Sequence, residues 1–234
     1  MKSRPWLSFT ENGKYKGNEP AFFDISSKEW SKFLTENYLT IKAEFEKFKK
    51  ENELIPYYNQ SLASDSKKWQ IQPLYFWGKK NKEIEASFPE TFKIIEQIDG
   101  QLSCSFSVLK PNTQIKPHVG DSNVMYRCHL GLSVPGGIEE TGIRVQNEKR
   151  EWREGALFAF CDAYEHEAWN NTDKERWVLI IDVLREEFIY QKLQICSEVN
   201  ASLFWQLKFQ RVNVITHLPR FIRKMIVKIS AYFF

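Results

Sequence analysis

Hydrophobic residues follow two different periods along the chain. Near the N-terminus they recur at helical intervals, just after Ser26 and Glu29, whose spacing is that of a capping box. The apolar positions of this helix, predicted over residues 27–50, are Trp30, Phe33, Leu34, Tyr38, Ile41, Phe45 and Phe48. Residues 52–67 are polar and loop-like, 68–77 predict a strand that ends at Gly78, and 89–99 predict a short helix stopped by Gly100.

From Leu102 the period of the apolar residues changes to two. In residues 102–109 the apolar side chains alternate with serines, and residues 125–133 alternate in the same way before a Pro-Gly-Gly turn. Further strands are predicted over residues 143–145, 156–161 and 176–184, and helices return over 186–197, 201–210 and 218–231. Short strands at such intervals favour a sandwich or jelly roll over a parallel α/β sheet.

Composition narrows the class of protein. The aromatic content of 15% suits a sheet-rich protein with a wide packed interior, and 234 residues suffice for one domain with appendages. A net charge of +3 gives no support for binding to nucleic acid. The four cysteines lie far apart without a CxxC pair, which favours a reduced, cytoplasmic setting. No secretory leader and no run long enough to span a membrane is apparent, and the oligomeric state is left open.

Two histidines stand where strands leave the predicted barrel. His118 precedes a glycine-containing loop, and His166 follows the strand over residues 156–161. Two imidazoles from two strands suit Fe(II). The alternative is a pair of ordinary loop histidines.

The arginines have competing interpretations as well. Arg176 opens a run that is apolar on both faces and therefore predicted to be buried, so it needs an anionic partner, such as a dicarboxylate. The alternative is an ion pair with Asp173 or Glu175 at the rim. Arg127 and His129 share one face of their strand, and the simplest alternation of such a strand leaves that face in solvent.

Several spacings together resemble one family. Pro117-His118-Val-Gly120, Tyr126-Arg127-Cys-His129, Gly155-Ala-Leu-Phe and Glu165-His166-Glu-Ala-Trp169-Asn170 followed by Arg176 resemble the aspartyl/asparaginyl β-hydroxylases. These are oxygenases that use Fe(II), 2-oxoglutarate and O2. The resemblance spans about a third of the chain, from Leu102 to Arg185. It implies a mainly β protein with flanking helices and a double-stranded β-helix (jelly-roll) core.

The resemblance also implies a role for each matching residue. His118 and His166 match the iron ligands, and Arg176 with Ser107 matches the pair that binds the distal carboxylate of 2-oxoglutarate. Arg127 and His129 match the pair that contacts its other carboxylate. Gly120 stands where most related oxygenases have a carboxylate ligand, so water is expected there, with Asp121 as the alternative. Asp162, Glu165 and Glu167 are either residues that orient His166 or a solvated acidic loop.

The implied organisation has a helical or extended flank over residues 1–100, the oxygenase core over 101–186 and a basic, amphipathic helical segment over 187–234. The family's chemistry implies hydroxylation of an unactivated carbon, first of all the β-carbon of an aspartyl or asparaginyl residue in a peptide, protein or carrier-bound amino acid. Hydroxylation of a lipid A-type fatty acyl chain at C2 is the alternative, and a non-catalytic β-barrel binding module is the alternative of another class. Residues 218–234 either touch the inner leaflet of a membrane or pack on the barrel with their basic residues outward.

Overall fold

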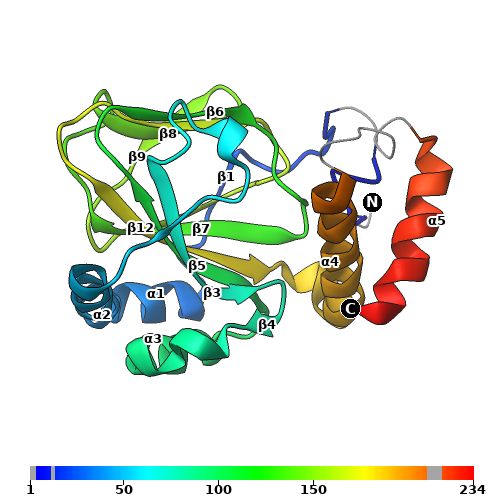
Figure 1. The fold of residues 1–234 in the computed structure, drawn as a ribbon, viewed down its shortest axis with the longest axis horizontal. Coiled ribbons are helices and arrows are strands. Elements are labelled where there is room, and N and C mark those ends of the chain that lie inside the picture. The colour runs from blue at the N-terminus through cyan, green and yellow to red at the C-terminus, as the bar shows by residue number, and fades with distance from the viewer. Residues whose placement is uncertain (1–3, 12–13, 210–217) are drawn as a thin grey trace.

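The computed structural model describes residues 4–11, 14–209 and 218–234. Two antiparallel sheets face each other (Figure 1). The larger sheet has eight strands in the order β1-β10-β7-β12-β5-β3-β2, with β4 paired to β3, and the smaller has four in the order β6-β11-β8-β9. Neighbours along this order come from distant parts of the chain, which is the connectivity of a jelly roll. The prediction of a mainly β, jelly-roll core with flanking helices is confirmed.

The strands of the larger sheet are β1 (Phe22–Phe23), β2 (Ile55–Pro56), β3 (Trp69–Phe76), β4 (Lys79–Lys80), β5 (Gln101–Leu109), β7 (Met125–Ser133), β10 (Leu157–Phe160) and β12 (Arg176–Leu184). Those of the smaller sheet are β6 (Thr113–His118), β8 (Thr141–Val145), β9 (Glu148–Glu151) and β11 (His166–Asn170). Four strands of the larger sheet thus precede residue 101. Sequence periodicity missed β6, β9 and β11, which are short and carry polar residues.

Helices cover the outer face of the larger sheet (Figure 1). They are α1 (Glu29–Glu36), α2 (Tyr38–Glu51) and α3 (Pro89–Glu96), with 3-10 turns η1 (Gln60–Leu62) and η2 (Lys82–Ser87) between them. The single helix predicted over residues 27–50 is therefore wrong in two respects. The chain breaks at Asn37, and the N-cap is Lys28 without a side-chain hydrogen bond, so Ser26 does not cap it.

The helices decide which face of the alternating strands is inside. Phe106 of β5 stacks on Phe45 of α2 with ring centroids 4.2 Å apart, and Cys128 and Leu130 of β7 join the same core. The apolar faces of β5 and β7 therefore pack against helices. Their polar faces, with Ser107 and Arg127, point between the two sheets. The expectation that the Arg127 face lies in solvent is wrong, because the helices pack against the apolar face of β7 and the Arg127 face points toward the other sheet.

The C-terminal part begins with η3 (Glu186–Gln191) and continues as α4 (Lys192–Phe209), α5 (Arg220–Ser230) and η5 (Ala231–Phe233). The two helices predicted over 186–197 and 201–210 are one continuous helix from residue 192, except that residue 210 lies outside the described residues. The helix predicted over 218–231 corresponds to α5, which begins two residues later, and its last residue belongs to η5. One side of α4 packs on the end of the barrel, in a core with Trp77, Leu102 and Leu184.

Candidate active site

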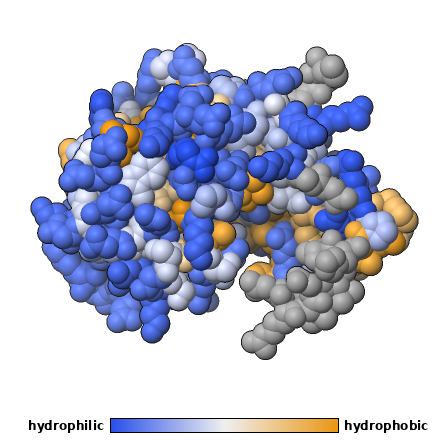
Figure 2. Space-filling view, turned by 90° about the horizontal axis from the view of Figure 1, so that it is seen from above, coloured by the Kyte–Doolittle hydropathy of each residue, from blue (hydrophilic) through white to orange (hydrophobic). Residues whose placement is uncertain are grey.

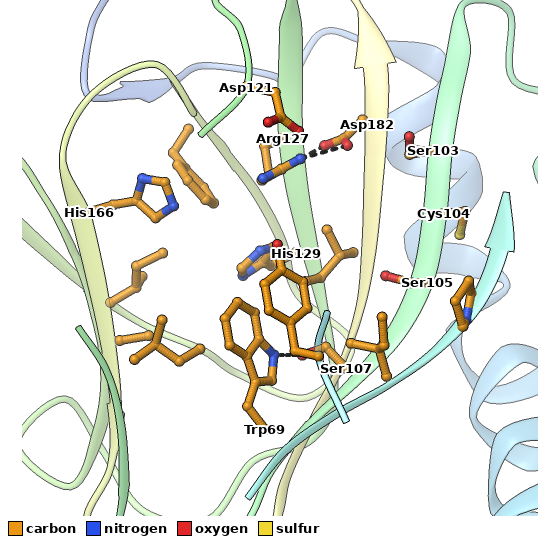
Figure 3. Close-up of a pocket in the computed structure, with 18 of the residues that line it drawn as sticks. Trp69, Ser103, Cys104, Ser105, Ser107, Asp121, Arg127, His129, His166 and Asp182 are labelled. Carbon is orange, nitrogen blue, oxygen red and sulfur yellow. Dashed lines mark hydrogen bonds and ion pairs between the residues drawn. The ribbon is translucent and has the colours of Figure 1, made fainter. Parts of the chain in front are cut away.

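His118 and His166 face each other across the smaller sheet. His118 ends β6 and His166 begins β11, and the two residues are direct partners in the antiparallel register. Their ring centroids are 4.2 Å apart. Both line the pocket between the sheets, and Figure 3 shows the His166 ring pointing into it. The strand pairing therefore brings together two imidazoles that are 48 positions apart in the sequence.

The backbone fixes the tautomer of both rings. Nδ1 of His118 lies 2.8 Å from the carbonyl oxygen of Lys116, and Nδ1 of His166 lies 2.9 Å from that of Tyr164. Since a carbonyl only accepts, each Nδ1 carries the proton and each Nε2 keeps its lone pair. Burial lowers the pKa of His118, and burial together with His118 lowers that of His166 further. Both rings are thus neutral imidazoles, the form that ligates a metal.

A carboxylate occupies the space beside Gly120. A Cβ on Gly120 would overlap the carboxylate of Asp162, which is fully buried. Asp162 Oδ1 lies 3.8 Å from His166 Nε2, and the backbone N–H of Asp121 donates to Oδ2 at 2.9 Å. In the described part of the chain, no group of three or more His, Cys, Asp or Glu side chains converges as a metal site. The structure thus supplies two histidines, His118 and His166, with the Asp162 carboxylate close to them.

Arg176 is a buried cation, and no acidic side chain of the described residues pairs with it. Its side chain is 1% exposed, and its Nε has no hydrogen-bond partner. The guanidinium lies over the ring of Trp152, 4.5 Å from the ring centroid. Burial lowers the pKa of Arg176 to about 9. The rim pairing proposed as the alternative does not form with Glu175, because that carboxylate binds Lys49 at 2.7 Å and Trp177 at 2.8 Å.

Ser107 and His129 lie in the same pocket as Arg176. Ser107 Oγ accepts a 3.1 Å hydrogen bond from Trp69 Nε1, so its own O–H remains free to donate. Trp152 Nε1 donates to His129 Nδ1 at 3.2 Å. Because burial lowers the pKa of His129 well below its usual range, the neutral ring carries its proton on Nε2. The pocket thus contains two further hydrogen-bond donors suited to an anion, the Ser107 O–H and the His129 Nε2–H.

Arg127 is held between two buried carboxylates. Its Nε and Nη2 donate to the two oxygens of Asp182, each at 2.9 Å (Figure 3). Its Nη1 donates to Asp162 Oδ1 at 2.5 Å. A guanidinium has five N–H groups, so one on Nη1 and one on Nη2 remain. Arg127 therefore fixes Asp162 beside the histidines and still has donors for a ligand.

The wall of the pocket formed by β3 and its neighbouring residues is mainly apolar and aromatic. It is lined by Tyr57, Tyr58, Ile71, Pro73, Tyr75, Phe76 and Trp77. Tyr57 stacks on Trp69 with ring centroids 3.6 Å apart. Asp121 also lines the pocket and lies above Arg127 in Figure 3. Burial together with Asp162 raises the pKa of Asp121 to about 7.

All the residues singled out from the sequence as iron or cosubstrate contacts line this one pocket. Trp152 and Trp69 were missed, because a single tryptophan among polar and charged residues gives no sign of orienting a neighbour. Asp182 could have been found, since a carboxylate inside the apolar run 176–184 needs a cation.

Comparison with known proteins gives a consistent result. The family profile described as aspartyl/asparaginyl beta-hydroxylase matches residues 35–186. A Rhizobium tropici protein named ornithine lipid ester-linked acyl 2-hydroxylase is 34% identical over 181 residues, which cover 74% of this chain and 64% of that protein. The mouse aspartyl/asparaginyl beta-hydroxylase is 33% identical over 129 residues, 53% of this chain and 17% of that protein. The chain thus spans less than two thirds of either relative.

Among solved structures, a prolyl-4-hydroxylase from Pseudomonas putida aligns with 66% of this chain and 89% of its own, at 19% identity and a TM-score of 0.44.

Proposed function

Because the chain belongs to the aspartyl/asparaginyl β-hydroxylase family, we propose that it is an Fe(II)- and 2-oxoglutarate-dependent hydroxylase. The observation that carries the proposal is Arg176. It is a buried guanidinium that pairs with no acid in the described part of the chain, in one pocket with two neutral histidines whose Nε2 lone pairs are available. A protein gains nothing from an uncompensated buried charge unless an anionic ligand pairs with it.

The residues present fit the metal and the cosubstrate. His118 and His166 would hold Fe(II) through Nε2, and Asp162 supplies a carboxylate beside them that can accept a hydrogen bond from a water ligand. When bound, Fe(II) with O2 supplies the oxidation that replaces a substrate C–H bond by C–OH, while 2-oxoglutarate becomes succinate and CO2. The chain's own residues bind and orient the cosubstrate, and they exclude water from the site.

Arg176 and Ser107 would bind the distal carboxylate of 2-oxoglutarate. The planar fork of Arg176 suits a carboxylate, and its stacking on Trp152 holds the plane of that fork. The Ser107 hydroxyl donates from the neighbouring strand β5. At the other end of the cosubstrate, His129 donates from Nε2, and Arg127 has the two N–H groups that Asp162 and Asp182 leave over. These donors fix one orientation of the cosubstrate before the reaction begins.

Anaerobic titration with Fe(II) and 2-oxoglutarate tests this assignment. The wild-type protein should develop a visible metal-to-ligand charge-transfer band. His118→Ala should lose it, and His217→Ala, at the chain's remaining histidine, should keep it. Succinate formation with O2 and no substrate gives a second readout. If the wild type shows neither band nor succinate, a non-catalytic binding module replaces the hydroxylase.

For the substrate, we place an acyl chain ahead of an aspartyl or asparaginyl residue, although the sequence favours the reverse order. Two observations support this. The Rhizobium tropici relative, 34% identical over 74% of the chain, is named as an acyl 2-hydroxylase, and the pocket wall around β3 is largely apolar. Aliphatic chains fit such a wall, whereas an aspartyl side chain needs polar partners.

An acyl substrate also implies peripheral contact with a membrane, and residues 218–234 are the segment we propose for it. Within the described residues, no helix combines the length and hydrophobicity needed to cross a bilayer. Mass spectrometry of lipid and protein fractions, from cells with and without the protein, decides between the substrates. One added oxygen on acyl chains supports our proposal, and one on aspartyl or asparaginyl residues overturns it.

A further inference from the structure

Helix α5 presents apolar side chains outward. Phe221, Met225 and Ile229, spaced by four residues, are 71, 54 and 57% exposed, and Tyr232 and Phe233 of η5 are 90 and 84% exposed. We call these five side chains the α5 face. Figure 2 shows hydrophobic residues gathered at the end of the molecule where α5 lies. Exposed apolar residues occur singly on most proteins, but a stripe along one helix indicates a binding surface.

The opposite side of α5 is fixed to the protein. Val227 is 1% exposed and packs with Ala201 of α4 and Phe9. Arg223 is buried and donates to the backbone carbonyl of Phe9 at 2.7 Å. Trp205 Nε1 donates to Ser230 Oγ at 2.8 Å. These contacts hold the helix in one rotation about its axis, so the outward direction of the α5 face is set by the fold.

Basic residues border the α5 face. By helical periodicity, Lys224 and Lys228 lie along one edge of the stripe, and Lys208 of α4 is exposed as well. Glu11 pairs with Arg220 and Lys224, whereas Lys208 and Lys228 form no ion pair with an acid among the described residues. From Val199 to Phe234 the sequence contains no acidic residue. This combination of an apolar face and a basic edge is typical of helices that lie in the interface of an anionic bilayer.

The C-terminal segment also lies next to the wall of the pocket. Phe234 contacts Phe204 of α4, with ring centroids 5.7 Å apart, and Lys79 lies over the ring of Phe234. Lys79 lies two residues after Trp77, which lines the pocket together with Phe76. The Trp77 carbonyl accepts a hydrogen bond from Asn200 of α4. The C-terminal segment therefore contacts β4 and the Trp77 backbone, next to residues that line the pocket.

We propose that the α5 face docks the protein on an anionic phospholipid bilayer, with the ring side chains of η5 in the headgroup region. This inference rests on the proposed function only for its purpose, which is to bring a lipid acyl chain to the pocket. The docking itself requires neither iron nor cosubstrate. Apolar burial supplies most of the binding, and the lysines add a preference for anionic lipid.

Co-sedimentation of the full chain with vesicles tests the proposal. One set of vesicles is pure phosphatidylcholine, and the other contains a fraction of phosphatidylglycerol. The wild type should bind the anionic vesicles more tightly, and added salt should weaken this preference. Phe221→Ser/Ile229→Ser should reduce binding about tenfold or more. Leu39→Ser serves as the control, because Leu39 is 65% exposed on α2, at the other end of the molecule (Figure 1).

Lys208→Gln/Lys228→Gln should remove the preference for anionic lipid and leave binding to neutral vesicles unchanged. Equal sedimentation of wild type and Phe221→Ser/Ile229→Ser would overturn the proposal. So would a wild-type dimer that this variant converts to a monomer without any vesicle binding, because the α5 face would then join two copies of the chain.

The charge-transfer band separates this inference from the proposed function. Phe221→Ser/Ile229→Ser should form the band with Fe(II) and 2-oxoglutarate as the wild type does. His118→Ala should lose the band and still bind vesicles. A wild type that docks on vesicles but forms no band would overturn only the proposed hydroxylase. A wild type that forms the band but does not dock would overturn only the docking surface.

Discussion

The carboxylate of Asp162 fills the space that a side chain at position 120 would need, and Gly120 leaves that space open. The carboxylate is held in place by Arg127 Nη1 at 2.5 Å and by the backbone N–H of Asp121 at 2.9 Å. The backbone N–H of Gly120 in turn donates to the carbonyl of Asp162. A glycine on one loop and an aspartate on another therefore form a single unit beside the two histidines.

Gly120→Ala is expected to lower the free energy of unfolding by about 2–4 kcal/mol, because the new Cβ must displace a buried, hydrogen-bonded carboxylate. In an Asp162→Gly background the same substitution should cost less than about 1 kcal/mol, since the space is empty. Urea denaturation of the four proteins measures the coupling. Gly137→Ala is the control, because its Cβ would meet only Glu151 Oε2 at 3.6 Å. Equal costs in both backgrounds would contradict the steric link.

Arg176→Met should stabilise the protein when no cosubstrate is present. The substitution removes a buried charge without an acidic partner, and a gain of about 1 kcal/mol is expected. The same variant should lose the rise in melting temperature that 2-oxoglutarate with Fe(II) gives the wild type. Thermal melts with and without ligand show both effects. Arg153→Met, at a side chain that is 77% exposed, should change neither.

Arg176→Lys should weaken binding of 2-oxoglutarate by about 30- to 1000-fold, which corresponds to about 2–4 kcal/mol for a lost bidentate contact. Lysine keeps the charge but not the planar fork. Titration of the charge-transfer band at fixed Fe(II) gives the two affinities. Wild-type affinity in Arg176→Lys would remove this residue from the cosubstrate site.

Arg127→Ala should destabilise the protein by about 3–5 kcal/mol at neutral pH, because Asp162 and Asp182 would remain buried without their cation. Arg127→Ala/Asp182→Asn should recover part of this loss. Arg144→Ala is the matched control. Arg144 pairs with Glu165 and Glu167, which are 43 and 32% exposed, so its loss should cost about 1 kcal/mol or less. Chemical denaturation provides all four values.

Asp121 should make stability depend on pH. Burial and Asp162 raise its pKa from 3.8 to about 7 in the folded protein. A raised acid pKa means that ionisation is harder in the folded than in the unfolded chain. The folded protein should therefore lose stability through this group as pH rises from about 4 to 7, and no further above 7.

Asp121→Asn removes the ionisation. The stability of this variant relative to the wild type should thus increase between pH 4 and 7 by about 1–3 kcal/mol and then level off. Urea denaturation of the metal-free protein across this range measures the difference. A difference that is constant with pH would show that Asp121 keeps an ordinary pKa.

Local pattern was sufficient for much of the β core. The alternation in residues 102–109 and 125–133 and the doubly apolar run at 176–184 gave the main strands, because side-chain period is a property of each segment alone. Arg127 and Arg176 could also be singled out from those segments alone, because a charged residue in an apolar strand needs a partner.

Only the tertiary structure decided which residues these side chains contact. His118 and His166 meet because β6 and β11 pair in register. Neither strand could be predicted from its own pattern of hydrophobic residues. Helices α1–α3 take the apolar face of β7 and so turn Arg127 inward. The sequence made α5 amphipathic by its period, but the contact of Arg223 with the Phe9 carbonyl determined which side faces outward. Periodicity fixes which residues share a face, whereas contacts between distant segments fix where that face points.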